Sequence, residues 1–143
     1  MDKNYTVGID LGATNIKAGL ILGNKFLAKN VVPTTDFPSP GELINALREQ
    51  VNQLLKQTGV SKNNLAGIGI GVPGPVDSIR GTTHYFPNIK GWHNVALKKI
   101  LQDKTGLPVF IDNDANLMTL AEGRLGAAKG KKNVIGITLG TGV

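Results

Sequence analysis

Short β-favouring runs fill the first third of the chain. Residues 5–10, 16–21 and 26–32 carry closely spaced Val, Ile, Leu, Tyr or Phe, and turns that contain Gly or Asn separate them. Turns of this length join antiparallel neighbours, because a parallel connection needs a dozen or more residues. The sequence therefore predicts a meander of antiparallel strands.

A helix is predicted to follow the meander. Ser39 and Glu42 have the spacing of a capping box, and Pro40 suits the first helical position. Apolar residues then recur every three or four positions, at Leu43, Leu47, Val51, Leu54 and Leu55. Gly59 follows, where helices commonly end in the left-handed conformation. We expect this helix to lay one apolar stripe on the sheet.

Strand and helix patterns alternate in the rest of the chain. Strands are predicted over residues 66–72, 109–111 and 134–139, whereas residues 77–93 show no regular pattern and are predicted to be irregular. A meander followed by alternating helices and strands predicts an α/β domain, with a mixed sheet covered by helices.

Two further helices are predicted between these strands. A short amphipathic helix ends at Gly106 and carries its apolar residues at Leu97, Ile100 and Leu101. A longer helix begins near Asn113 or Asp114. We expect its apolar residues to face inward, namely Leu117, Leu120, Ala121 and Leu125.

Composition narrows the class of protein. The chain has 143 residues, 41% of them hydrophobic and 18% charged, which is typical of one globular domain spanning residues 1–143. Because it has no cysteine, disulfides, thiolate zinc sites and cysteine nucleophiles are excluded. Its apolar stretches are interrupted well before the ~20 residues that cross a bilayer, and its start lacks the pattern of a signal peptide. We expect no membrane association and a cytoplasmic location.

A net charge of +6 and a pI near 9.7 raise the question of a polyanionic partner. The basic residues are scattered, apart from a cluster at Lys129, Lys131 and Lys132, and aromatic residues make up only 5% of the chain. Little is therefore available on which bases could stack, and no nucleic-acid partner is predicted. His84 and His93 lack the spacing of metal ligands and receive no role.

The first candidate site is the glycine turn after the first strand. Asp10 ends that strand, and the turn offers backbone N–H groups that can bind phosphate oxygens, with Asp10 facing a magnesium ion or its water. The turn residues are Gly12, Ala13, Thr14 and Asn15. A strand follows rather than a helix, so this is not a P-loop. A plain β-hairpin with an aspartate in its turn explains the same residues.

A second candidate lies where a strand leads into the longer helix. Residues 112–116 set two carboxylates and two amides there, and a helix N-terminus favours an ionised carboxylate that can accept a proton. A simple N-cap is the alternative, since Asp and Asn are preferred caps.

Three glycine- or proline-containing turns complete the candidates. Gly74 and Asn88 lie in turns at a sheet edge, where ligands bind in α/β proteins, although ordinary turn chemistry also accounts for them. Trp92 is interpreted as a packed anchor. Gly140, Thr141 and Gly142 form a turn after a β-run that can also bind phosphate.

Five motifs in a fixed order resemble the amino-terminal half of the ROK family of sugar kinases and sugar-responsive repressors. They are GIDLGATNIKAG, GVPGPVD, PNIKGW, IDNDAN followed by AEG, and the final GTGV. The resemblance covers essentially the whole chain. It implies the ribonuclease H-like fold of the actin-like ATPases, with a mixed five-stranded sheet flanked by helices.

The resemblance also implies roles for individual residues. Asp114 matches the catalytic base, and Gly74, Asn88 and Asn113 match positions that hold the sugar's hydroxyls. In this resemblance Asp10 lies near the magnesium ion and contacts it through water. The phosphate loops that bind ATP are formed by Gly12, Ala13, Thr14 and Asn15, and by Gly140, Thr141 and Gly142. Ala13 replaces a usual glycine, and Asp112 replaces a usual glutamate.

The implied reaction is phosphoryl transfer from ATP to the 6-hydroxyl of a hexose, glucose being the first expectation. The chain stops just after a glycine turn, so we expect a fragment without the family's carboxy-terminal domain. That domain carries the zinc motif and most of the adenosine pocket, and full-length members form homodimers. We therefore expect very weak or absent activity from these 143 residues alone.

Two alternatives stay open beside the kinase. A repressor of the family would bind sugar through the same domain but needs a DNA-binding module in front, and the first strand begins about five residues from the start. A non-catalytic sugar- or nucleotide-binding module, or another ATPase of the superfamily, would keep the phosphate loops without needing PNIKGW.

Overall fold

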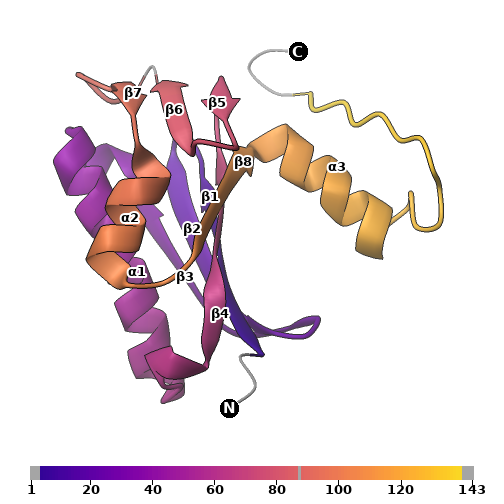
Figure 1. Cartoon of the computed structure of the whole chain (residues 1–143), viewed down its shortest axis with the longest axis horizontal. Coiled ribbons are helices and arrows are strands. Elements are labelled where there is room, and N and C mark those ends of the chain that lie inside the picture. The colour runs from indigo at the N-terminus through magenta and orange to yellow at the C-terminus, as the bar shows by residue number, and fades with distance from the viewer. Residues whose placement is uncertain (1–3, 87, 140–143) are drawn as a thin grey trace.

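A mixed five-stranded sheet organises the chain in a computed structural model that describes residues 4–86 and 88–139 (Figure 1). Its strand order is β3-β2-β1-β4-β8. The strands span Tyr5–Leu11 (β1), Asn15–Leu22 (β2), Lys25–Pro33 (β3), Leu65–Val72 (β4) and Val109–Asn113 (β8). This agrees with the predicted α/β class and mixed sheet.

The strand directions determine which edge of the sheet is suited to binding a ligand. β2 pairs antiparallel with both β1 and β3, which confirms the predicted hairpins. β1, β4 and β8 run parallel to one another, so their carboxyl ends meet at one edge of the sheet. Loops at that edge are the usual place for a ligand in an open α/β sheet.

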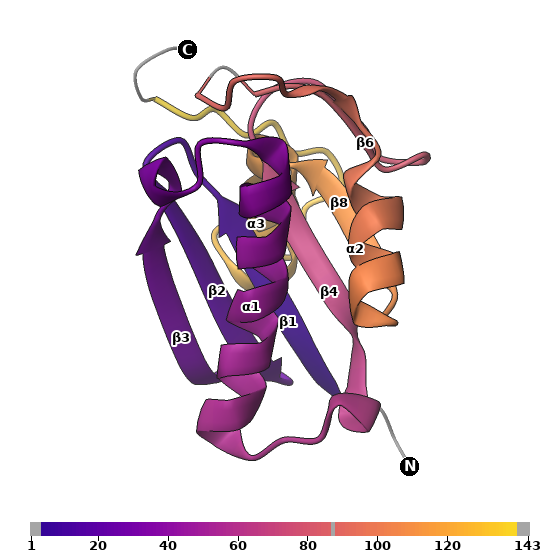
Figure 2. The same cartoon turned by 90° about the vertical axis from the view of Figure 1, so that its left-hand side faces the viewer.

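Two helices cover one face of the sheet (Figure 2). α1 (Pro40–Thr58) begins with the predicted capping box of Ser39 and Glu42 and ends at Gly59, whose φ is 70°. α2 (Leu97–Thr105) ends at Gly106 in the same conformation. Two short 3₁₀ turns flank α1, namely η1 (Thr34–Asp36) and η2 (Lys62–Asn64).

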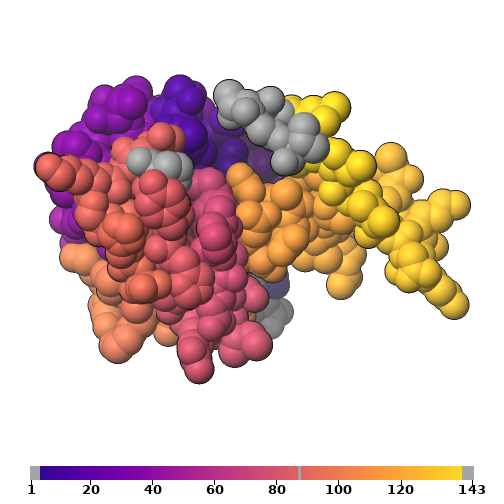
Figure 3. Space-filling view, turned by 90° about the horizontal axis from the view of Figure 1, so that it is seen from above, coloured from indigo at the N-terminus to yellow at the C-terminus, as the bar shows by residue number. Residues whose placement is uncertain are grey.

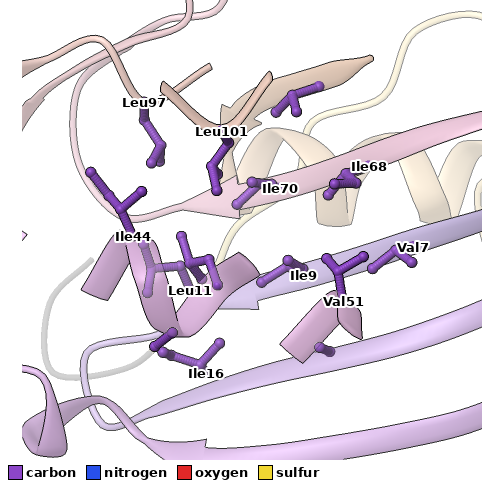
Figure 4. Packing of buried hydrophobic residues seen from close by; sticks show 14 of the residues in the cluster. Val7, Ile9, Leu11, Ile16, Ile44, Val51, Ile68, Ile70, Leu97 and Leu101 are labelled. Atoms are coloured by element: carbon purple, nitrogen blue, oxygen red, sulfur yellow. The ribbon is translucent and has the colours of Figure 1, made fainter. Parts of the chain in front are cut away.

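The hydrophobic core lies between these helices and the sheet. Alternate residues of β1 and β4 point toward α1 and α2, as the close-up in Figure 4 shows. The labelled members are Val7, Ile9, Leu11, Ile16, Ile44, Val51, Ile68, Ile70, Leu97 and Leu101. The stripe predicted for α1 is buried at Leu43, Leu47, Val51 and Leu54, and Leu55 is half-buried.

A second, three-stranded sheet corrects the prediction that residues 77–93 are irregular. It contains β5 (Val76–Asp77), β6 (Thr82–Tyr85) and β7 (His93–Val95), in that order and antiparallel. These strands are two to four residues long, too short for a periodic pattern to be visible in the sequence.

The longer helix, α3 (Asp114–Leu125), begins where predicted, but the inward face expected for it is wrong. Leu120, Ala121 and Leu125 are exposed, and Leu117 is half-buried. In Figures 1 and 3, α3 and the segment after it extend away from the body of the molecule. Helical spacing identified the helix, but no packed layer among the described residues covers these side chains.

The strand predicted over residues 134–139 is also absent from the structure. The segment runs without regular hydrogen-bonded structure, with Ile135, Ile137 and Leu139 exposed. A strand needs a partner to satisfy its backbone, and no strand of the described chain pairs with it. Across residues 4–86 and 88–139, no helix combines the length and the hydrophobicity needed to span a membrane.

Candidate functional site

The first glycine turn is held from two sides. Within it, the Gly12 N–H donates to the Asn15 carbonyl at 3.0 Å, and a Cβ on Gly12 would lie 2.8 Å from that oxygen, so the turn requires glycine. From outside, the Thr34 N–H donates to the Thr14 carbonyl at 2.8 Å, and the Thr34 hydroxyl donates to the Gly12 carbonyl at 2.8 Å. Ala13 and Thr14 themselves are exposed.

Asp10 lies beside this turn and forms an ion pair with Lys17. The two residues are directly opposite in the β1–β2 ladder, and Lys17 Nζ lies 3.6 Å from Asp10 Oδ2. Both side chains are more than half exposed, so the pair contributes little to stability but leaves the carboxylate accessible. The sequence motifs did not single out Lys17. Asp10 and Lys17 lie equally far from the turn at residues 12–15, however, and this spacing predicts that they pair.

The start of α3 is built by a network of carboxylates and amides. Asn113 is the N-cap, its Oδ1 accepting from the Ala115 and Asn116 N–H groups at 2.9 and 3.3 Å. Asp112 Oδ1 accepts from the Asn113 N–H at 2.7 Å and from Asn116 Nδ2 at 3.0 Å. The cap alternative therefore applies to Asn113, and the exposed Asp114 is the first helical residue.

Gly74 is tied to this helix start from another loop. Asn113 Nδ2 donates to the Gly74 carbonyl at 3.2 Å, and Gly74 has φ of 76°, a conformation that favours glycine. A Cβ on Gly74 would lie 3.1 Å from the Tyr85 carbonyl, so the turns at 73–75 and after β6 lie side by side.

The turn after β6 contains the remaining described candidate, Asn88, which is exposed. Buried Trp92 anchors that turn, with Nε1 donating to Thr83 Oγ1 at 2.8 Å and its ring edge-on to Phe86, so the predicted packed role is confirmed. The exposed His84 and His93 belong to the same small sheet. Gly140, Thr141 and Gly142 lie outside the described residues.

One groove brings together the two acids that the sequence singled out. It has a volume of about 670 Å³ and runs over the face of the sheet opposite α1. Asp10 and Lys17 line it from the sheet, and Asp114 lines it from α3. Gly71 forms part of its floor, where a Cβ would lie 3.5 Å from the Asp114 Cα.

The carboxylates that line this groove suit a metal ion that binds together with a phosphate-containing substrate. In the described part of the chain, no group of three or more His, Cys, Asp or Glu side chains could hold a metal ion. Magnesium is commonly bound through one or two carboxylates together with substrate phosphates and water. The accessible Asp10 carboxylate fits that mode.

The amino-acid sequence is similar to a family model and to named proteins. The family model described as "ROK family" matches residues 6–143. A glucokinase from Halalkalibacterium halodurans is 38% identical over the whole chain, and a xylose repressor from Caldicellulosiruptor bescii is 34% identical over 99% of it. The chain spans 43% and 36% of these relatives, less than half of their length.

Two crystal structures resemble the fold. A ROK hexokinase from Thermus thermophilus has a TM-score of 0.77 and 42% identity, with 88% of this chain and 40% of the other covered. A ROK family glucokinase from Streptomyces griseus, in complex with glucose and AMPPNP, has a TM-score of 0.77 and 33% identity, with 88% and 38% covered. The ribonuclease H-like fold of the actin-like ATPases, expected from the motifs, is thereby confirmed. The chain belongs to the ROK family and corresponds to the amino-terminal half of its members.

Proposed function

We propose that this chain is the sugar-side portion, with the first phosphate loop, of a kinase that phosphorylates the 6-hydroxyl of a hexose, glucose first. The observation that carries the proposal is the common groove of Asp10 and Asp114, which come from elements about a hundred residues apart in the sequence. Asp10 lies at the end of the parallel strand β1 beside the glycine turn at residues 12–15, and Asp114 directly follows the parallel strand β8. The similarity to glucokinases, one of them in complex with glucose and AMPPNP, supports the same reaction.

The turn at Gly12, Ala13, Thr14 and Asn15 binds phosphate oxygens of ATP in this proposal. Its Gly12 and Thr14 carbonyls accept hydrogen bonds from Thr34, which leaves the exposed side of the turn for an anion. Asp10 would hold magnesium through a water molecule, and the bound ion would supply charge neutralisation at the transferring phosphate. Gly140, Thr141 and Gly142 form the second phosphate loop of the proposal.

Asp114 is the proposed general base. Its Oδ1 accepts the Ala115 N–H at 2.8 Å, so we assign Oδ2 to the sugar hydroxyl. As the hydroxyl oxygen attacks the γ-phosphorus, the new O–P bond forms, the bond to the bridging oxygen breaks, ADP leaves and Asp114 takes the proton. Asp114 is exposed in the first turn of α3, so its carboxylate is accessible to the hydroxyl that gives up this proton.

Gly74, Asn88 and Asn113 are the proposed contacts of the sugar's other hydroxyls. The bond between Asn113 and Gly74 fixes these two residues relative to Asp114, which holds a hydroxyl in line for attack. Asp112 orients Asn113 through its backbone N–H, so its replacement of the usual glutamate bears on sugar choice through this network.

An amide-shift titration of this chain tests the proposal. With a panel of hexoses and N-acetylhexosamines, we expect glucose to shift Gly74, Asn88, Asn113 and Asp114. Adding magnesium-ATP is expected to shift the amides of residues 12–15. Asp114→Asn should keep the glucose shifts at Gly74 and Asn88, since the amide has a similar shape. Asp103→Asn, at an exposed position of α2, is the matched control.

Shifts outside these residues, or no response to any sugar, would contradict the sugar site. A coupled assay for ADP release gives the second readout. We expect little or no turnover, because the chain spans only 43% of the length of the similar Halalkalibacterium glucokinase. Clear turnover that Asp114→Asn abolishes would overturn that expectation while supporting Asp114 as the base.

A sugar-sensing domain is the second candidate, because a xylose repressor is also similar over nearly the whole chain. A sensor needs the sugar contacts but not the phosphate loop. Xylose shifts at Gly74 and Asn113 without any magnesium-ATP response at residues 12–15 would favour the sensor over the kinase.

A further inference from the structure

Thr34 is a buried residue next to the proposed phosphate loop that no motif includes. It is 1% exposed and follows the pair Asn15–Pro33 at the end of the β2–β3 ladder. Both of its hydrogen-bond donors bond to the loop: the hydroxyl to the Gly12 carbonyl, and the backbone N–H to the Thr14 carbonyl, each at 2.8 Å. The Thr34 carbonyl accepts from the Phe37 N–H at 3.1 Å, which anchors the residue within η1.

These bonds determine which way the loop's peptide groups face. No peptide bond in the described chain is cis, and the C=O and N–H of a trans peptide point in opposite directions. Since the Gly12 carbonyl is directed at the Thr34 hydroxyl, the Ala13 N–H is directed away from it. Within the described residues, no carbonyl or side chain accepts a hydrogen bond from that N–H.

We infer that Thr34 is a positioning residue that orients the loop at residues 12–15 so that the Ala13 N–H faces the phosphates of ATP. The inference rests on the proposed function, because only that proposal makes the loop at residues 12–15 a phosphate-binding site. A loop whose carbonyls are already paired can bind an anion without first reorganising.

The test compares Thr34→Val with Thr34→Ser in the 143-residue chain. Valine keeps the branched shape and the backbone N–H but removes the hydroxyl, whereas serine keeps the hydroxyl. Thr35→Val, at the exposed neighbour, is the matched control. Amide hydrogen exchange is measured at Gly12 and at residue 34, because both N–H groups close the loop. Affinity for magnesium-AMPPNP is measured from the shifts of residues 12–15.

Thr34→Val is expected to speed exchange at these two amides about 3- to 10-fold and to weaken nucleotide binding by a similar factor. Exchange in β1 and β2 should stay unchanged, and Thr34→Ser should restore both values. Unchanged loop exchange, exchange that rises throughout the chain, or failure of serine to restore binding would each overturn the inference. A wild-type chain whose loop amides do not respond to nucleotide would instead refute the proposed phosphate site, even if Thr34→Val still loosens the loop.

Discussion

The two faces of the five-stranded sheet differ in what covers them. On the face beneath α1 and α2, alternate residues of every paired strand contribute to one core. On the opposite face, Phe26, Val31 and Phe110 are 57%, 62% and 65% exposed. Apolar side chains thus occur on both faces, and only the first face is packed. Strand alternation, which sets the face on which a side chain lies, therefore decides which apolar side chains stabilise this chain.

The largest expected effect comes from the packed face. Leu47 of α1 is fully buried against the sheet, so Leu47→Ala removes buried apolar surface and leaves a cavity. We expect it to lower the free energy of unfolding by about 2–5 kcal/mol, measured by urea denaturation.

Leu120→Ala in α3 is the matched control, because the same substitution is made in a helix where the side chain is exposed. It should change the free energy of unfolding by no more than about 0.5 kcal/mol. An equal loss of unfolding free energy in the two variants would show that α3 is packed in solution. It would contradict the difference between the packed α1 and the exposed α3.

The elements that sequence could predict are those whose signals are local. α1 combines a capping box, a stripe at helical spacing and a terminal glycine within one segment. α3 has an equally visible spacing, but its predicted inward face depended on a neighbour that lies nowhere in the described chain. Residues 134–139 fail as a strand for the same reason, since β-propensity cannot supply a pairing partner.

The same distinction between local and long-range signals applies to the candidate site. Glycine turns and acids at strand ends are readable from short motifs, and the structure brings Asp10 and Asp114 to one groove. The bonds that hold these turns cross 22 residues from Thr34 to Gly12 and 39 residues from Asn113 to Gly74. Such pairings follow from topology, so a single sequence gives no local sign of them.

A smaller effect is expected at the start of the helix that covers the packed face. Ser39 Oγ accepts from the Glu42 N–H at 3.3 Å, and Glu42 Oε2 accepts from the Ser39 N–H at 3.1 Å. Ser39→Ala should therefore lower the free energy of unfolding by about 1 kcal/mol. Ser78→Ala, in an exposed turn, is the control and should leave the urea midpoint unchanged.

The smallest effect is expected on the uncovered face, at Phe110. Its neighbour Ile111 points to the core and is 4% exposed, so these adjacent residues of β8 lie on opposite faces of the sheet. Phe110→Thr should alter the free energy of unfolding by no more than about 0.5 kcal/mol, because threonine suits a strand and little buried surface is lost. Ile111→Thr should cost several times more, since it places a hydroxyl in the core.

Binding of a hydrophobic dye provides a second readout for the pair. Phe110→Thr should reduce dye fluorescence, because it removes an aromatic ring from an exposed apolar patch, whereas Ile111→Thr should raise it by loosening the core. If Phe110→Thr instead costs as much stability as Ile111→Thr, the second face must be covered in solution. Sedimentation velocity would then establish whether another copy of the chain covers it, because association would make the loss of stability depend on protein concentration.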